Sequence, residues 1–423
     1  MDEPRPSPGD EHQTDQAQSQ ASQRTGPSPR EFVGLCALLI SLVALSIDSM
    51  LPALSTIGEE LGAPDENQAQ FVLSALFLGL GLGQMIYGPL SDRFGRKPAI
   101  QAGLALFALG CLLSVVATSF SMMLAGRVLQ GLGVAGPRIA TVAMVRDRYA
   151  GAAMAQIMSL IMTLFVLVPA VAPAIGQLLL FTGSWRLIFG MLLAVALIGW
   201  IWLSIRQPET LKPEHRRPFS FAAIGSAISE TCRNRIAAGY ALAAGFLFGA
   251  FLGYLNCAAQ IFQIQYGLGA LFPVYFATLA LAFGSASLLN SRLVMRLGMR
   301  SLTRVAIIGV IIGSPAFFLV AAMAGGHPPL WALMLYLLVV FFCVGLLFGN
   351  LNALAMEPLG HIAGIAASVI GTVTTLLSML LGATIGLAYD GTVLPLIGSF
   401  AVLGALSFAA MLWAESKRRN PVR

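Results

Sequence analysis

Three ionisable side chains fall within long apolar runs of this sequence: Asp48, Arg127 and Arg138. An ionised side chain at the centre of a bilayer costs about 2.5 to 3.5 kcal/mol on insertion scales, so each is a functional candidate. A carboxylate paired with a guanidinium group stays ionised, whereas separation in a dry cavity favours its protonated form. A pair between Asp48 and Arg127 that forms and breaks would therefore bind and release a proton.

Helix geometry brings Asp48 and Arg127 to similar depths. With a rise of about 1.5 Å per residue, both lie roughly 8 Å below the same membrane surface. The alternative is a static salt bridge that fixes two helices. Arg138 is about 20° from Arg127 around the helix. It either lines a cavity and attracts an anionic group or extends to the interface.

A charged cluster separates two apolar runs in the stretch GPLSDRFGRKPAI. Anchoring by positive loops explains its cations. It explains neither the acid among them nor the two glycines, which permit a tight reversal. Such an ion cluster can act as a latch between helix bundles, formed in one conformation and broken in the other. The predicted latch residues are Gly88, Asp92, Arg93, Gly95, Arg96 and Lys97.

The composition requires that these residues sit on membrane helices. The chain of 423 residues is 57% hydrophobic and 10% charged, with a mean hydropathy of +0.80. A soluble domain would carry about a quarter charged residues. Spans of about 20 apolar residues are expected at twelve places: 32–54, 70–90, 98–117, 122–145, 157–181, 185–205, 236–258, 270–291, 303–324, 329–352, 363–388 and 393–414.

The spacing of these spans predicts an all-α membrane protein with twelve transmembrane helices in two six-helix bundles. A weak internal echo, in which Arg296, Gly298 and Arg300 align with Arg93, Gly95 and Lys97, suits parallel halves. The expected organisation is a disordered cytoplasmic tail at 1–30, bundles at 31–205 and 236–415, a cytoplasmic linker at 206–235, and a basic cytoplasmic tail at 416–423.

Lys and Arg concentrate in the loops and tails of one side, which by the positive-inside rule is cytoplasmic. Both termini are therefore expected in the cytoplasm. The net charge of +6 reflects this topology and contact with anionic lipid headgroups, and needs no nucleic acid to explain it.

The charged cluster resembles the loop between helices two and three of the major facilitator superfamily, which reads GxLxDRxGRK. That resemblance implies that Asp92 and its basic neighbours stabilise an outward-open state. The run RVLQGLGVAG, which begins at Arg127, resembles the superfamily's helix-four pattern RxxQGxGxA. In proton-driven members this arginine is implicated in coupling.

Two further stretches resemble the Bcr/CflA branch of drug exporters within the drug:proton antiporter-1 type. Asp48 stands in SIDSMLPALSTIGEELG, similar to that branch's helix-one signature, although Ser55 replaces the usual second proline. The stretch VPAVAPAIGQ resembles the antiporter motif GxxxGPxxGG and departs from it at several positions. Export is therefore favoured, with Pro169, Pro173 and Gly176 as the antiporter hinge.

Other polar residues in the spans could line a substrate cavity together with Arg138, namely Gln130, Asn256 and Asn350. Polar residues also hold membrane helices together, and this reading is preferred for the second half of the chain. Four aromatic residues could form an apolar pocket or equally a lipid-facing surface: Phe248, Phe251, Tyr254 and Phe262.

We therefore expect a secondary active transporter that exports amphipathic drug-like compounds across the inner membrane by proton antiport and alternating access. It would act as a monomer, without cofactor or metal. The alternative is a proton-coupled symporter, or an exporter of a natural metabolite or nutrient. No GxxxxGK[ST] loop supports an ATP-driven pump. The four histidines are scattered and indicate neither a metal site nor an enzyme.

Overall fold

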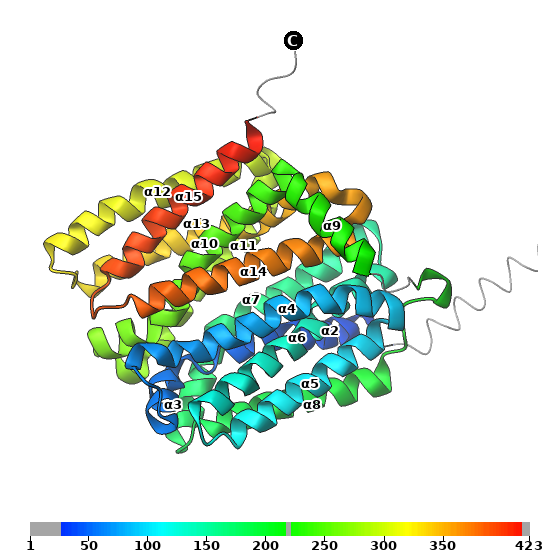
Figure 1. Cartoon of the computed structure of the whole chain (residues 1–423), viewed down its shortest axis with the longest axis horizontal. Coiled ribbons are helices and arrows are strands. Elements are labelled where there is room, and N and C mark those ends of the chain that lie inside the picture. The colour runs from blue at the N-terminus through cyan, green and yellow to red at the C-terminus, as the bar shows by residue number, and fades with distance from the viewer. Residues whose placement is uncertain (1–26, 217–220, 417–423) are drawn as a thin grey trace, which may run out of the picture.

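The computed structural model describes residues 27–216 and 221–416, and every regular element in these ranges is helical. The first bundle contains α2 (Pro29–Asp48), α3 (Leu54–Leu61), α4 (Phe71–Phe94), α5 (Arg96–Val115), α6 (Phe120–Arg148), α7 (Gly151–Phe181) and α8 (Arg186–Arg206). The second contains α10 (Arg235–Ala259), α11 (Phe272–Leu297), α12 (Met299–Met323), α13 (Leu330–Met356), α14 (Ala363–Leu387) and α15 (Leu394–Glu415). Figure 1 shows the long helices running side by side.

The prediction of twelve spans in an all-α fold is confirmed. The described residues hold 11 stretches that are long and apolar enough to cross a bilayer. One of these, Leu330–Leu387, has 58 residues. It contains two spans, α13 and α14, because the short turn η6 (Glu357–Ile362) leaves helical geometry at Leu359.

The first span is longer than predicted and is broken. The helix α2 ends at Asp48, a single 3-10 turn η1 (Leu51–Ala53) follows, and α3 continues the span to Leu61. Pro52 has no backbone N–H to donate, which favours an interruption here. The span expected at 32–54 is present, but its helix is interrupted, and Asp48 lies at the last residue before the break.

The predicted tails and linker lie partly outside the described residues. Residues 1–26 and 417–423 are not described, but α2 already begins at Pro29, where the Ser28 side chain accepts a hydrogen bond from the Glu31 N–H at 3.3 Å. Within 206–235, residues 217–220 are not described. The remainder includes a further helix, α9 (Phe221–Arg233), which packs against α14 and α10.

Glycines bring the helices of the first bundle into close contact. A Cβ atom at Gly79 of α4 would overlap the backbone of Val128 in α6, and one at Gly131 of α6 would overlap the backbone of Leu76 in α4. Close backbone approach of this kind is a main source of helix association in lipid, where both surfaces are apolar. The position of Arg127, one turn before Gly131, is therefore set by this contact.

The two bundles meet along α4 and α14, and also along α7 and α11. On the first seam the Gln84 amide donates to the Thr375 hydroxyl at 3.0 Å, and the Thr372 hydroxyl donates to the Gly81 carbonyl at 2.9 Å. Glycines on each helix receive side chains of the other, in the pairs Gly81 with Leu376, Gly88 with Ser368, Gly371 with Gln84 and Gly386 with Gln70.

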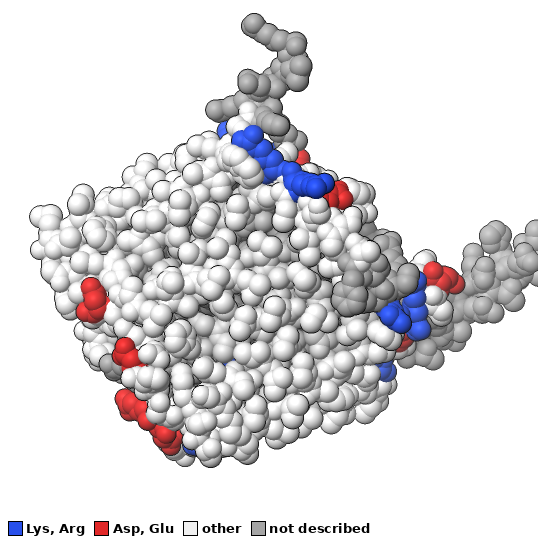
Figure 2. All heavy atoms as spheres, in the orientation of Figure 1, with Lys and Arg blue, Asp and Glu red and all other residues white. Residues whose placement is uncertain are grey.

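Charged residues separate to the two ends of the helices (Figure 2). One end, which we call the basic end, carries α9, the end of α15 and most of the Lys and Arg side chains. The opposite, acidic end carries Glu59, Glu60, Asp65 and Asp390, with Arg186 paired to Glu60 at 3.1 Å.

The close contact of α4 and α6 yields a stability prediction. The variant Gly131→Ala places a methyl group on a backbone that cannot move aside, and we expect it to lower stability by about 1 to 3 kcal/mol. The matched control is Gly190→Ala in α8, where nothing lies within 4 Å of the added atom. Thermal unfolding of purified protein in detergent measures both, and equal midpoints would contradict the proposed packing.

Candidate functional site

A cavity of about 300 Å³ lies between the two bundles. Its size is at the lower end of the range for small-molecule sites. The wall is mostly apolar, and its ionisable or amide-bearing side chains are those of Asp48, Gln84, Arg138 and Asn352. The first bundle contributes α2, α4, α6 and α7 to this wall, and the second contributes α10, α11, α13 and α14.

Aromatic rings from the second bundle form one side of this cavity. Phe248 and Phe251 stack with ring centroids 5.4 Å apart, Phe251 lies 5.4 Å from Phe341, and Tyr254 meets Phe341 edge-on at 4.7 Å. Phe248, Phe251 and Tyr254 therefore line a pocket and not a lipid-facing surface. Phe262, the fourth aromatic residue of that prediction, is fully buried and packs on Phe272 and Tyr275 outside this cavity. The Tyr254 hydroxyl is buried and has no hydrogen-bond partner among the described residues.

Asp48 is 5% exposed and faces the same cavity. Within the described part of the chain, its carboxyl group makes no hydrogen bond and no ion pair. The α2 helix ends at this residue, and the negative end of a helix dipole offers no support to a carboxylate. The site therefore favours a neutral carboxyl group or a cationic ligand.

Arg127 does not pair with Asp48 in this conformation. Its guanidinium donates to the carbonyl of Val72 at 3.0 Å, the carbonyl of Ser46 at 2.9 Å and the Gln130 side chain at 2.6 Å. Residues two apart on a helix do not share a face, so Ser46 turns toward α6 while Asp48 turns toward the cavity. Similar depth did not ensure contact, and the expected ion pair is absent here.

Two of the four predicted cavity residues lie elsewhere. Gln130 is fully buried, and besides accepting from Arg127 it donates to the Gly110 carbonyl at 3.1 Å and the Ser114 hydroxyl at 2.9 Å. Asn350 exchanges two hydrogen bonds with Asn290 at 2.8 and 3.1 Å. Both amides join helices, because a polar group at this depth is satisfied within the protein.

Asn256 and Arg138 do lie on cavity walls. Asn256 lines a small pocket of about 20 Å³ near the acidic end, and its amide has no partner among the described residues. Arg138 lines the central cavity. That either residue contacts a substrate stays a prediction.

The predicted hinge residues lie on α7, which remains one helix through both prolines. Pro169 lines the central cavity. A Cβ atom at Gly176 would overlap the carbonyl group of Ser49, so α7 approaches the chain where the first span breaks. A hinge role for Pro169, Pro173 and Gly176 is not tested by this geometry and stays a prediction.

A vestibule of about 900 Å³ lies at the basic end and adjoins the central cavity, since Gln84 and Arg138 line both spaces. At the acidic end the bundles are joined. The Asn67 amide donates to the Tyr389 carbonyl at 2.9 Å, and the Gln260 amide donates to the Asn67 side-chain oxygen at 2.7 Å. This conformation is therefore accessible from the basic end and closed at the acidic end.

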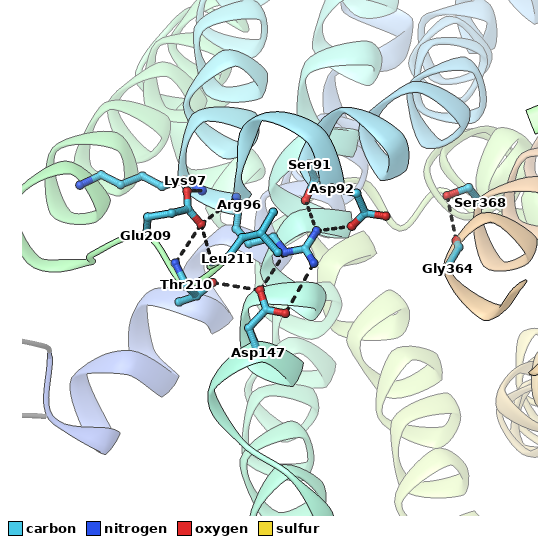
Figure 3. A network of polar contacts seen from close by, with 10 residues as sticks. All are labelled: Ser91, Asp92, Arg96, Lys97, Asp147, Glu209, Thr210, Leu211, Gly364 and Ser368. Carbon is cyan, nitrogen blue, oxygen red and sulfur yellow. Dashed lines mark hydrogen bonds and ion pairs between the residues drawn. The ribbon is translucent and has the colours of Figure 1, made fainter. Parts of the chain in front are cut away.

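The charged cluster lies where α4 ends and α5 begins, with Gly95 between the two helices, and it lines part of the vestibule. Figure 3 shows its polar contacts. Arg96 pairs with Asp92, with Asp147 at 2.8 Å, and donates to the Ser91 hydroxyl at 2.9 Å. Lys97 reaches the Ser204 carbonyl at 2.8 Å. Arg93 is exposed and lies over the Phe94 ring at 5.0 Å.

Glu209, in the segment after α8, caps the start of α5. Its carboxylate accepts hydrogen bonds from the backbone N–H groups of Arg96 and Lys97, each at 3.0 Å. A negative charge is favourable at the positive end of a helix dipole. Gly95 has a φ of +113°, and a Cβ atom there would overlap the Glu209 carboxylate. Glycine is thus required for both backbone conformation and space.

Residues 36–383 match the family model described as Major Facilitator Superfamily. The chain belongs to that superfamily. A Bacillus subtilis protein named "Uncharacterized MFS-type transporter YdgK" is 30% identical over 91% of this chain and 96% of its own. The "Bicyclomycin resistance protein homolog" of Haemophilus influenzae is 28% identical over 92% of this chain and 98% of its own.

"Multidrug resistance protein D" of Escherichia coli is 27% identical to this chain over 80% of it and 85% of the relative. Among solved structures, the xylose transporter XylE from E. coli in a partially occluded inward-open conformation superimposes with a TM-score of 0.71. That likeness has 14% identity and covers 92% of this chain and 97% of the other, so it supports the fold alone. The protein is a transporter of small molecules and not an enzyme.

Sequence reasoning missed several polar residues of this transporter. Asn67, Gln84 and Glu209 join segments that are far apart in the chain. For Glu209 a signal existed, since it is one of only two acids in 206–216, a segment that also holds three Lys or Arg residues. Its partners are backbone N–H groups, which no residue pattern identifies.

The contact between Gly95 and Glu209 predicts a non-additive pair of substitutions. Glu209→Ala removes the helix cap and should cost about 0.5 to 2 kcal/mol. Gly95→Ala adds backbone strain and an overlap with the carboxylate. The overlap disappears in the double variant. We therefore expect Gly95→Ala to lower stability by about 1 kcal/mol less in the Glu209→Ala background than in the wild type. Thermal unfolding in detergent measures both.

Gly298 offers a matched control in the second bundle. It also separates two helices, has a φ of +77°, and has nothing within 4 Å of an added Cβ atom. Gly298→Ala should therefore combine additively with Glu209→Ala. Additivity of the Gly95 pair would contradict the steric role of the carboxylate.

Proposed function

We propose that this transporter exports amphipathic drug-like compounds across the inner membrane in exchange for protons. The observation that carries the proposal is Asp48, a carboxyl group on the wall of an aromatic cavity with no ion-pair partner among the described residues. In a dry site this group is neutralised by either a proton or a cationic cargo. Competition between the two couples export to proton entry.

The access of the cavity suits the first step of export. By the positive-inside rule the basic end is cytoplasmic, and both bundles begin and end there. The vestibule then opens to the cytoplasm, where cargo enters and displaces the proton from Asp48. The amide contacts of Asn67 close the opposite side in this state.

Arg127 remains the proposed partner of Asp48 in the outward-open state. Its hydrogen bond to the Ser46 carbonyl ties it to α2 only two residues from Asp48. A rotation of the end of α2 would replace this carbonyl with the carboxylate. The break after Asp48 and the glycine contact with α7 at Gly176 are where such a rotation would be absorbed, which supports the hinge role of α7.

The loop from Gly88 to Lys97 is the proposed conformational latch. In this state its ion pairs stay within the first bundle, and Gly88 contacts Ser368 at the start of α14. Closing the vestibule would bring α14 toward Asp92, which already lines it. The proposal also includes two bundles, at 31–205 and 236–415. Both tails lie in the cytoplasm, and the protein acts as a monomer.

The names of the relatives support drug export, since two concern bicyclomycin resistance and multidrug resistance. The alternative is proton symport, or export of a natural metabolite. Everted vesicles with an acidified interior distinguish the directions. Added substrate should collapse the pH gradient in an antiporter and leave it unchanged in an importing symporter.

Asp48→Asn tests the proton site. We expect loss of substrate-induced proton movement in everted vesicles and loss of drug resistance, with normal expression, because an amide cannot exchange a proton at this position. Glu59→Gln, which neutralises an exposed acid on the same span, serves as the control. Unchanged resistance in cells that carry Asp48→Asn would reject the proton role.

Asp92→Asn tests the latch. A group that stabilises one conformation changes the rate of interconversion more than the affinity for cargo. We expect the maximal transport rate to fall about tenfold with little change in KM, measured as initial rates in vesicles. Glu214→Gln, another acid of the vestibule wall, is the control. A rise in KM alone would argue against the latch.

A further inference from the structure

Arg138 differs from Arg127 and Arg96, the two buried arginines of the first bundle. Arg127 and Arg96 each donate to three acceptors within the protein. Arg138 has no hydrogen bond and no ion pair to any described residue, and it lies where the vestibule meets the central cavity. Arg146 also has no partner among the described residues, but it lines the vestibule alone and not the central cavity. A guanidinium group with five free donors at a cavity wall is available to a ligand.

The depth of Arg138 argues against a simple anchoring role at the interface. It lies ten residues before the end of α6 at Arg148, or about 15 Å along the helix. That distance exceeds the reach of its side chain toward the membrane surface. Arginine in such a place, with acceptors on neither its own helix nor its neighbours, calls for an acceptor from outside the chain.

Asp48 and the Tyr254 hydroxyl are unpartnered in the same cavity, on the side away from the vestibule. The start of α2 and the end of α6 are level, since Arg148 donates to the Pro27 carbonyl at 2.9 Å. Counting from that level at 1.5 Å per residue places Asp48 and Arg138 roughly 13 Å apart along the helices. The aromatic rings line the same cavity as both groups, and such rings also attract cations.

We propose that the cavity selects amphipathic zwitterions: compounds with a basic amine at one end of an aromatic body and an acidic group at the other. The amine binds Asp48 and Tyr254, the aromatic body stacks on Phe251 and Phe341, and the acid binds Arg138. The inference rests on the proposed function, because it takes the central cavity as the cargo site. A compound with both charges neutralises both unpartnered protein groups, and one with a single charge leaves the other exposed to an apolar wall.

A matched set of fluorescent quinolones tests this selectivity. Norfloxacin carries an amine and a carboxylate, its ethyl ester keeps only the amine, and its N-acetyl derivative keeps only the carboxylate. Binding to the purified full chain in detergent, without a pH gradient, is followed by fluorescence. We expect norfloxacin to bind about tenfold or more tightly than either derivative, as a charged hydrogen-bonded pair implies.

The Arg138→Gln variant should bring the ratio of ester to norfloxacin dissociation constants close to one. Arg138→Lys retains the charge and should restore most of the ratio. The matched control Arg146→Gln changes an arginine two turns further along α6, on the vestibule wall alone, and should keep the full ratio. Equal affinities for all three probes in the wild type, or a full ratio in Arg138→Gln, would overturn the inference.

The outcome is separate from that of the proposed function. Binding without a gradient is independent of the direction of transport and of proton coupling. Everted vesicles that show no antiport, together with a retained binding ratio, would reject export by antiport and leave the selectivity standing. Proton antiport without preference for the zwitterion would support the proposed function and reject the selectivity. If Arg146→Gln also brought the ratio of ester to norfloxacin dissociation constants close to one, the preference would come from the overall positive charge of the vestibule. That result would overturn the assignment to Arg138.

Discussion

Arg127, a guanidinium group that is fully buried at membrane depth, finds its acceptors on two neighbouring helices and on its own helix. Its bonds to Ser46, Val72 and Gln130 hold α2, α4 and α6 in one arrangement. In this arrangement Asp48 is turned away from the only arginine expected to neutralise it. Because Arg127 is hydrogen-bonded to other acceptors, the carboxyl group of Asp48 remains available to a proton or to cargo.

The fold was largely predictable, because the bilayer requires long apolar helices and the composition displays them. The twelve spans and the family follow from patterns that local sequence carries. The break after Asp48 was less accessible, since Pro52 alone does not show whether a helix bends or stops. Gln130 was difficult to place for a similar reason, since an amide within a span indicates a need for partners, and only the packing of helices shows whether these are protein or cargo. For Asn350 the preferred expectation, that it joins helices, agrees with its hydrogen bonds to Asn290.

Contacts to backbone groups account for most of what sequence could not show. Arg127 binds two carbonyls, Asn67 binds another, and Glu209 binds two backbone N–H groups. Almost every residue carries a backbone N–H and a carbonyl group, so no sequence pattern identifies the ones that bind these side chains. The unpartnered state of Arg138 is the converse case. The sequence left open whether Arg138 attracts an anion or extends to the interface. The arrangement of the surrounding helices leaves it without an acceptor among the described residues.

The glycine seam between α4 and α14 limits how the two halves can move. Two glycines of α4 lie against side chains of α14, and two glycines of α14 lie against side chains of α4 or of the residue just before it, so that the contacts are spread along the seam. Because these contacts lie at several levels, sliding of α4 along α14 would break them all, whereas a tilt of one bundle against the other keeps them. The packing of α4 on α14 therefore favours a motion in which the two bundles tilt about this contact while α4 and α14 keep their register.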